Sequence, residues 1–170
     1  APSRLIDGSP SPELPPGGET TGRRKLSAWL HSGVAGYDRG HDDLAADATS
    51  RLSPYLHFGC ISPLEVERRA GDVAGAAPFV RQLAWRDFFH QLLAARPETA
   101  HEDMRPRGRR WSGDGEALEA WKKGETGCPI VDAGMRQLRR EGYMHNRARL
   151  ITASFLVHDL RVDWRAGARH

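Results

Sequence analysis

The sequence predicts an all-α fold, and three observations support that prediction. Apolar residues recur at three- and four-residue spacing in almost every segment beyond residue 20, which is the period of an amphipathic helix. Leucine outnumbers isoleucine plus valine by 16 to 11, whereas strands favour β-branched residues. No segment shows the sustained apolar/polar alternation of a half-buried strand. The chain of 170 residues is long enough to fold around one hydrophobic core.

The first 19 residues predict an interdomain linker. Residues 1–19 are rich in Pro, Gly and Ser, a composition typical of segments that connect domains. We expect the helical domain to occupy residues 20–170. Because the chain begins with Ala1 and not with Met, we also expect another segment to precede the linker.

The first half of the domain contains clear helix signals. We expect a helix from about Thr21 to His31, since Gly33 follows as a terminating residue. A loop of 17 residues, 33–49, comes next. It is longer than a compact connection needs, and such loops often bind a ligand. The sequence SPLE at 62–65 is a capping box with Pro at the first helical position, which predicts the start of another helix.

The remaining predicted helices begin and end at residues with recognised capping roles. They are a helix over 78–96 stopped by Pro97, a helix from the cap Asp114 to Gly124, a helix from Pro129 to Gly142, a helix capped by Asn146, and a further turn within DWRAGARH at the end of the chain.

The charge of the chain is concentrated in its second half. Residues 1–85 hold 9 basic and 10 acidic side chains, and residues 86–170 hold 16 and 12. This excess points weakly to an anionic partner. The alternative is that these arginines are ordinary solvated surface cations, since 22 of the 25 basic residues are Arg.

The two cysteines favour a reduced, cytosolic protein. Cys60 and Cys128 lie 68 residues apart without a CxxC pair, a pattern that does not suggest a disulfide framework or a zinc site. No signal-peptide pattern opens the chain, and the apolar run Leu150–Val157 is far shorter than the ~20 residues that a membrane-spanning helix needs.

Three segments carry residues suited to binding. TSRLSPYLHFG at 49–59 places three hydroxyls and one Arg at a helix start, which suits a phosphate, although such residues are also ordinary caps. On the helix FVRQLAWRDFFHQLL at 79–93, Gln82, Trp85, Arg86 and Phe89 share one side and suit stacking on a base, unless Trp85 is a partly buried structural residue. RPRGRRW at 105–111 suits a phosphate contact or a solvated loop.

Familiar hydrolytic motifs do not occur. The eight His residues form no HxxxH or HxH pair, and the chain contains no GxSxG or HExxH sequence. Metal-assisted hydrolysis and serine nucleophile chemistry therefore lack support.

Taken together and in order, these segments resemble the FAD-binding helical domain of the DNA photolyase/cryptochrome family. The resemblance rests on TSRLSPYLHFG, QLAWRDFFHQLL, RRWSGD, DWR and the long run AWKKGETGCPIVDAGMRQLRREGYMHNRARLITASFLVHDL. It spans roughly Gly18 to His170, and the block from Gly127 to Arg165 is the most specific part.

The resemblance implies a role for each matching residue. Reduced FAD is the implied cofactor, held by Tyr37, Thr49, Ser50, Arg51, Leu52, Ser53, Asn146 and Arg149. UV-damaged DNA is the implied partner, contacted by Gln82, Trp85, Arg86, Phe89, Asn146 and Arg147, with Trp85 as the wall on which a flipped lesion stacks. Trp111 and Trp164 match two members of a tryptophan relay that passes an electron to the photoexcited flavin, so the implied catalytic residues are Trp85, Asn146, Trp111 and Trp164. No metal, membrane or protein partner is implied.

Departures from the family pattern bear on the substrate. Gln82 stands where many cyclobutane-type photolyases have Glu, and Gln is common in six-four photolyases and animal cryptochromes. Those relatives usually have His in place of Asn146, and Leu150 replaces a Met or a His. We therefore expect cyclobutane pyrimidine dimers to be the substrate. Tyr143 and Cys128 replace a usual Trp and Tyr, which we interpret as packing changes.

The resemblance also implies that parts of the family architecture are absent. Family members carry an α/β domain ahead of the helical domain that binds an antenna chromophore, and they continue beyond the equivalent of His170. We expect this chain to be a fragment of a light-driven DNA repair lyase. A cryptochrome-like light sensor and a non-enzymatic DNA-binding remnant are the alternatives.

The fragment is expected to behave differently from its parent. Helices that would pack on the absent segment should present an apolar face, with Phe155 and Trp164 as its most exposed members, and such patches promote association. We expect the isolated chain to be poorly soluble or self-associating, to bind FAD weakly or not at all, and not to repair DNA.

Overall fold

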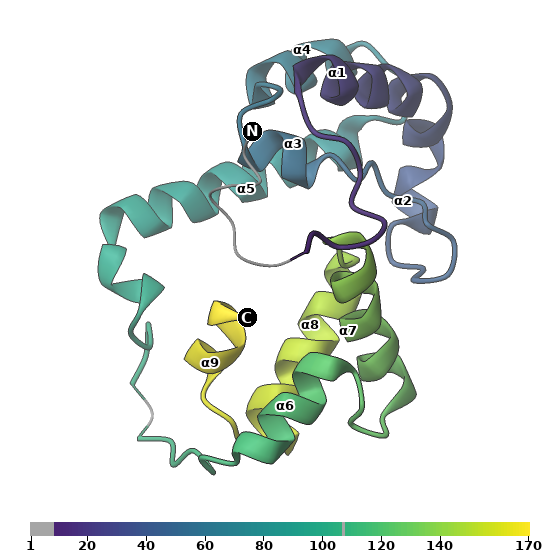
Figure 1. The fold of residues 1–170 in the computed structure, drawn as a ribbon. Coiled ribbons are helices and arrows are strands. Elements are labelled where there is room, and N and C mark those ends of the chain that lie inside the picture. The colour runs from purple at the N-terminus through teal and green to yellow at the C-terminus, as the bar shows by residue number, and fades with distance from the viewer. Residues whose placement is uncertain (1–8, 107) are drawn as a thin grey trace. The chain divides into compact units, whose positions relative to one another are not determined.

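A computed structural model describes residues 9–106 and 108–170, and these residues form helices and loops without a strand (Figure 1). The all-α prediction is therefore confirmed. The chain divides into two compact units, one of residues 16–105 and the other of residues 1–15 together with 106–170. Each unit has its own cluster of buried apolar side chains. Among the described residues, no helix is both long and apolar enough to cross a membrane.

The unit of residues 16–105 contains five α-helices and three shorter helical turns. The α-helices are α1 (Glu19–Ala28), α2 (Tyr37–Gly40), α3 (Ser53–His57), α4 (Pro63–Gly71) and α5 (Ala77–Ala95). A π-helical turn (Trp29–Gly33) and a 3₁₀ turn (Val34–Gly36) connect α1 to α2, and another 3₁₀ turn (Pro97–Ala100) follows α5.

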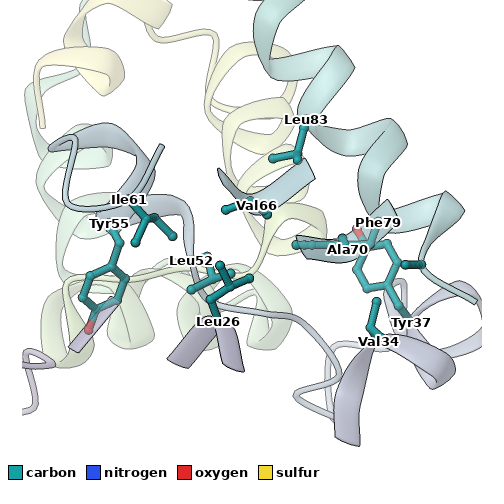
Figure 2. Close-up of a cluster of buried hydrophobic side chains, with 11 residues drawn as sticks. Leu26, Val34, Tyr37, Leu52, Tyr55, Ile61, Val66, Ala70, Phe79 and Leu83 are labelled. Carbon is teal, nitrogen blue, oxygen red and sulfur yellow. The ribbon is translucent and has the colours of Figure 1, made fainter. Parts of the chain in front are cut away.

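The core of this unit draws side chains from all five helices. Helices α2 and α4 both pack against α5, and Figure 2 shows the buried cluster that they share with α1 and α3. The buried members are Leu26, Val34, Tyr37, Leu52, Tyr55, Ile61, Val66, Ala70, Ala76, Phe79 and Leu83.

The predicted helix starts of this unit are largely confirmed. Ser62 caps α4 by accepting the Leu64 N–H at 3.2 Å, and Pro63 is the first helical residue. The prediction of a 17-residue loop over 33–49 is partly wrong, because residues near its start form a 3₁₀ turn and α2. Val34 and Tyr37 lie three residues apart and are both buried. This spacing puts them on one side of a helical turn, where they can enter the core together.

The described residues of the other unit form four α-helices and one π-helical turn. Helices α6 (Gly115–Lys123), α7 (Pro129–Glu141) and α8 (Asn146–Ser154) are followed by a π turn (Phe155–Asp159) and by α9 (Trp164–Arg169). Helix α7 packs against both α6 and α8. The buried apolar residues are Trp121, Val131, Met135, Met144, Ala148, Leu156 and Val162.

The caps of α6 and α7 confirm the predicted boundaries. Asp114 Oδ1 accepts the Ala117 N–H at 2.9 Å at the start of α6. Gly124 and Gly142 end α6 and α7 with φ angles of 69° and 63°, in the left-handed region that glycine enters without a steric penalty. These local signals were sufficient to locate both helices.

The predicted cap of α8 is wrong by one residue. His145, not Asn146, is the N-cap residue, and its ring Nδ1 accepts the Arg147 N–H at 3.1 Å. Asn146 is the first residue of the helix. Its side chain is exposed and so is not used to close the first turn of α8.

Part of the predicted linker packs on α7. The Glu13 N–H donates to the Arg140 carbonyl oxygen at 2.9 Å, and the Glu13 carboxylate pairs with the Arg140 guanidinium. Residues 1–8 lie outside the described residues. The division into a linker over 1–19 and one domain over 20–170 stays a prediction.

Candidate functional site

The segment from Thr49 to Ser53 forms a tight turn anchored in a core. Leu52 is 1% exposed, and its N–H donates to the Ser50 Oγ at 3.3 Å. Arg51 has a φ of 50° and its Nε lies 2.7 Å from the Asp47 carboxylate. Leu52 thus holds the backbone in place, while Thr49, Ser50 and Arg51 are partly exposed and Ser53 is exposed.

The donors in this turn have the chemistry that a diphosphate requires. Three hydroxyls and one guanidinium lie within five residues, and Arg binds phosphate oxygens through a fixed pair of N–H groups. Helix α3 is only five residues long, so a helix dipole adds little here. Leu52 could contribute only backbone atoms, because its side chain is buried.

Tyr37 is a core residue rather than an open surface aromatic. It is 9% exposed and makes edge-to-face contacts with Trp29 and Phe79 at centroid distances of 5.9 and 5.7 Å. His41 stacks on its ring at 4.9 Å. A cofactor contact at Tyr37 is therefore limited to the small part of the side chain that remains exposed.

Helix α5 presents an aromatic face that does not enter the core of its unit. Phe79 and Leu83 are buried, whereas Trp85 and Phe89 are 52% and 59% exposed. The Trp85 and Phe89 rings stack at a centroid distance of 6.2 Å. Gln82 is exposed as well. Trp85 is thus about half exposed, and its role in binding a base stays a prediction.

Phe88 and Arg86 complete this face of α5. The Phe88 ring meets Trp85 edge-to-face at 5.7 Å and is 50% exposed. Arg86 is partly buried and its guanidinium lies 3.3 Å from the Asp87 carboxylate. Exposed aromatic rings next to a cation and an amide can stack on a nucleobase and contact a phosphate.

The start of α8 carries the second group of predicted site residues. Asn146, Arg147 and Arg149 are all exposed, while His145 beneath them is 4% exposed. The His145 carbonyl oxygen accepts the Arg149 N–H at 2.9 Å, which completes the first helical turn. An amide and two guanidiniums are thus presented from one turn of one helix.

The two predicted relay tryptophans belong to the same unit, and hydrogen bonds join their segments. The Ser112 N–H donates to the Arg161 carbonyl oxygen at 2.8 Å, and the Ser112 hydroxyl donates to the Leu160 carbonyl oxygen at 3.0 Å. Trp111 therefore adjoins a residue fixed to the segment that leads into Trp164. Both indoles are partly buried.

A cation lies over one of these indoles. The Arg165 guanidinium carbon is 4.8 Å from the centroid of the Trp164 ring. Asp163 holds that guanidinium at 3.1 Å and also caps α9 by accepting the Arg165 N–H at 2.9 Å. Trp164 and Phe155, expected to be the most exposed apolar residues, are partly buried instead, because Trp164 is covered locally and Phe155 packs on the core.

Asp132 is a buried acid that the sequence did not single out. It is 7% exposed and accepts three hydrogen bonds, from the Thr126 N–H at 2.8 Å, the Thr126 hydroxyl at 2.6 Å and the Gly127 N–H at 3.0 Å. Burial raises the pKa of Asp132, but these bonds and the nearby Arg136 outweigh burial and hold the pKa below its ordinary value. The sequence does carry a signal for Asp132, because it is an acid in the first turn of a helix that follows a Gly-rich turn.

The structure thus groups the predicted residues in two sets, one in each unit. The unit of residues 16–105 holds Tyr37, the turn 49–53 and the α5 face, and the other unit holds Trp111, the start of α8 and Trp164. Within the described ranges 9–106 and 108–170, no group of three or more His, Cys, Asp or Glu side chains could hold a metal ion.

Comparison with known proteins gives consistent matches. Residues 79–170 match the model of the family described as the FAD binding domain of DNA photolyase. The chain is 58% identical over 163 residues to a deoxyribodipyrimidine photo-lyase of Streptomyces griseus, covering 94% of this chain and 36% of that protein. The chain therefore spans about a third of the length of the curated relatives it matches.

Two solved structures are similar to this chain in fold. A class III photolyase from Agrobacterium tumefaciens is 40% identical with a TM-score of 0.85, and the match covers 88% of this chain and 33% of that one. A cryptochrome from Synechocystis is 31% identical with a TM-score of 0.85, covering 99% of this chain and 38% of that one.

Proposed function

The chain belongs to the family of the FAD binding domain of DNA photolyase, and from that premise we propose that it supplies the flavin and lesion site of a light-driven DNA repair lyase. The substrate proposed is a cyclobutane pyrimidine dimer, and the class of enzyme is the deoxyribodipyrimidine photo-lyase. The relative from Streptomyces griseus, 58% identical, carries that name.

The exposed aromatic face of α5 is the observation that carries the proposal. Trp85 is half exposed beside Phe89 and Arg86, and its neighbours Phe79 and Leu83 already fill the core. An exposed indole of this kind is costly unless it meets a partner. A base extruded from DNA offers a flat apolar surface for stacking, and DNA supplies phosphates for nearby cations.

The residues present fit reduced FAD as the cofactor. Thr49, Ser50, Arg51 and Ser53 would hold the diphosphate through their donors, with Leu52 fixing the turn. Asn146 and Arg149 would donate toward the anionic edge of the flavin ring. When bound, the cofactor supplies an electron on absorbing light and receives it back after the dimer has split.

The other residues bind, orient and transfer charge. Trp85 and Phe89 would form the stacking wall, and Gln82 would donate its amide to the lesion. Arg86 and Arg147 would contact phosphates, which orient the strand without reading its sequence. Trp111 and Trp164 would conduct an electron inward to restore the reduced cofactor. The free thiols of Cys60 and Cys128 support a reducing, cytoplasmic setting.

A blue-light sensor of the cryptochrome type is the second candidate. The match to the Synechocystis cryptochrome covers 99% of the chain, and this observation favours the alternative. A sensor would retain the cofactor turn at 49–53 but would not require Trp85 to bind a lesion. Dimer reversal therefore separates the two candidates.

A chimera tests the proposal directly. The matched segment of the Streptomyces griseus photo-lyase is replaced with this chain, and the product is assayed for flavin content and for dimer reversal under blue light. We expect a flavin-containing, active chimera, while the isolated 170 residues are expected not to repair DNA. A chimera that binds flavin but leaves dimers intact would support the sensor instead.

Substitution of Trp85 tests the lesion wall. In the chimera, W85A should weaken binding to dimer-containing DNA by ~1–3 kcal/mol and barely change binding to undamaged duplex. F58A is the matched control, since Phe58 is 78% exposed in the same unit but lies outside α5. Equal losses on both DNAs would mean that Trp85 does not contact the lesion.

A further inference from the structure

His145 combines two features that are rarely found together at a helix start. Its ring Nδ1 accepts the Arg147 N–H at 3.1 Å, a role usually taken by Ser, Thr, Asp or Asn. Its other ring nitrogen, Nε2, is buried and has no hydrogen-bond partner among the described residues. The two nitrogens therefore have different environments.

The hydrogen bond at Nδ1 determines the state of the ring. A backbone N–H can only donate, so Nδ1 must carry a lone pair and no proton. The ring is then neutral, with its proton on Nε2. That Nε2–H is buried without an acceptor, which is an unfavourable arrangement for a polar group.

The surroundings of His145 tie this ring to α7. The His145 backbone N–H donates to Gln137 Oε1 at 3.4 Å, and the Gln137 amide in turn lies 3.4 Å from the Glu141 carboxylate. The His145 carbonyl oxygen accepts the Arg149 N–H. One buried residue thus connects the end of α7 to the first turn of α8.

The side chains carried by that turn are exposed. Asn146 and Arg147 follow His145 directly, and Arg149 is one turn further on. All three residues lie in the first turn of α8, so the directions in which their side chains leave the helix depend on the backbone of that turn. The bonds of His145 set that backbone.

We propose that His145 is the positioning residue for the exposed cluster Asn146, Arg147 and Arg149. The neutral ring with its proton on Nε2 closes the first turn of α8 and so presents the three side chains in one arrangement. This role rests on the proposed function, because the cluster is the part of this unit that would meet flavin and DNA. His145 acts through these neighbours and does not itself touch either ligand.

A pair of substitutions separates capping from loss of the ring. H145A removes the acceptor at the helix start, whereas H145N restores a side-chain oxygen that can accept the Arg147 N–H. D114A is the matched control, because it removes the N-cap of α6 in the same unit and leaves α8 unchanged. H158A controls for loss of an exposed histidine.

Amide hydrogen exchange in the 170-residue chain gives the first measurement. H145A should speed exchange of the Arg147 and Arg149 amides by about fivefold to tenfold, since loss of a cap is worth ~1 kcal/mol. H145N should stay within about twofold of the unsubstituted chain. D114A should speed exchange at Ala117 only. Unchanged exchange in H145A would overturn the proposal.

Binding of the chimera to a duplex that carries a thymine dimer, measured at low salt, gives the second measurement. H145A should weaken binding by about threefold to tenfold. H145N should bind as tightly as the unsubstituted protein, and D114A and H158A should leave binding unchanged. Equal losses in H145A and D114A, or failure of H145N to restore binding, would overturn the positioning role.

The two measurements also distinguish a failure of the proposed function from a failure of the role proposed for His145. If the unsubstituted chimera does not bind the duplex, the result counts against the proposed function. The exchange of the Arg147 and Arg149 amides then decides the role of His145 alone. Nitrogen-15 chemical shifts of the ring check the tautomer in the same samples, and a proton on Nδ1 would contradict the proposal.

Discussion

Asp132 has a carboxylate that is buried at the first turn of α7 and accepts hydrogen bonds from Thr126 and Gly127. Each bond favours the charged form of the side chain. The folded state therefore holds the pKa of Asp132 below the value in the unfolded chain. The stabilisation that follows is complete above the ordinary pKa and is lost as the pH falls through the folded value.

Replacement of Asp132 by Asn tests this linkage. At pH 7, D132N should lower the free energy of unfolding by ~1.5–3 kcal/mol, because the amide N–H₂ cannot accept the Gly127 N–H. The difference should begin to shrink below about pH 4, the ordinary pKa of Asp, and should be lost as the pH falls through the lower pKa of the folded state. Urea denaturation at both pH values measures it. D159N, an exposed change in the same unit, should show neither effect.

Arg51 provides a prediction about the cofactor turn. In the chimera, R51A should reduce bound flavin per mole of protein, because a charge-assisted phosphate contact contributes ~1.5–3 kcal/mol. Flavin absorbance of the purified protein measures the occupancy. R39A changes an exposed Arg in the same unit and should leave it unaltered. Unchanged flavin content in R51A would mean that Arg51 does not bind the cofactor.

At the scale of helices, the contact between α7 and α8 depends on the absence of a side chain. A Cβ at Gly134 would lie 3.1 Å from Thr152 Cγ2 and 3.4 Å from Ala148 Cβ. Both neighbours are buried on α8. The two helices therefore approach closely at this point, and a larger residue there would push them apart.

Substitution of Gly134 by Val tests this contact. G134V should destabilise the chain by ~1–3 kcal/mol, as expected for overpacking of a filled core. A133V is the control, because Ala133 is the neighbouring exposed position on α7. Val is a better helix former than Gly and a poorer one than Ala, so helix propensity favours G134V and disfavours A133V. Thermal unfolding measures both variants. A loss in G134V no larger than that in A133V would mean that the contact between α7 and α8 is not overpacked by the larger side chain.

The helix boundaries also show which features of the fold could be predicted from the sequence. Asp114, Gly124 and Gly142 were predictable because caps act within one turn, between residues close in the chain. The cap of α8 was missed because His rarely takes that role, and Asn146 beside it is a preferred residue.

The candidate site was predictable to a similar extent. Spacing on α5 placed Trp85 and Phe89 on one side, but only the structure shows that this side is exposed and that Phe79 faces the core. Tyr37 was matched to a cofactor contact, yet its burial follows from contacts with Trp29 and Phe79 that no local pattern contains. Asp132 likewise depends on a turn that only folding creates.

At the scale of the whole molecule, two separate cores predict two steps of unfolding. The core around Leu26 and the core around Met135 share no member. The described residues between Ala100 and Gly115 form no helix, and Arg109 and Arg110 in this segment are exposed. Trypsin should therefore cut first at these two residues, and mass spectrometry should identify the fragments.

Calorimetry of the intact chain gives an independent test of the same prediction. Two overlapping transitions are expected, and D132N should move only the transition of the unit that contains α7. A single transition with equal calorimetric and van't Hoff enthalpies would mean that the two cores unfold as one. Movement of both transitions by D132N would lead to the same conclusion.

The two hydrogen bonds from Ser112 to Leu160 and Arg161 have a consequence for how this protein can vary. Because Trp111 is attached to this junction from one side and Trp164 from the other, the spacing of the two indoles does not depend on the length of chain that leads up to them. Insertion of two or three Gly and Ser residues after Arg109 should therefore be tolerated. An insertion between Ser112 and Asp114, or between Arg161 and Trp164, should not be. The segment that precedes Trp111 is thus the place where the chain can change in length while the spacing of the two indoles is preserved.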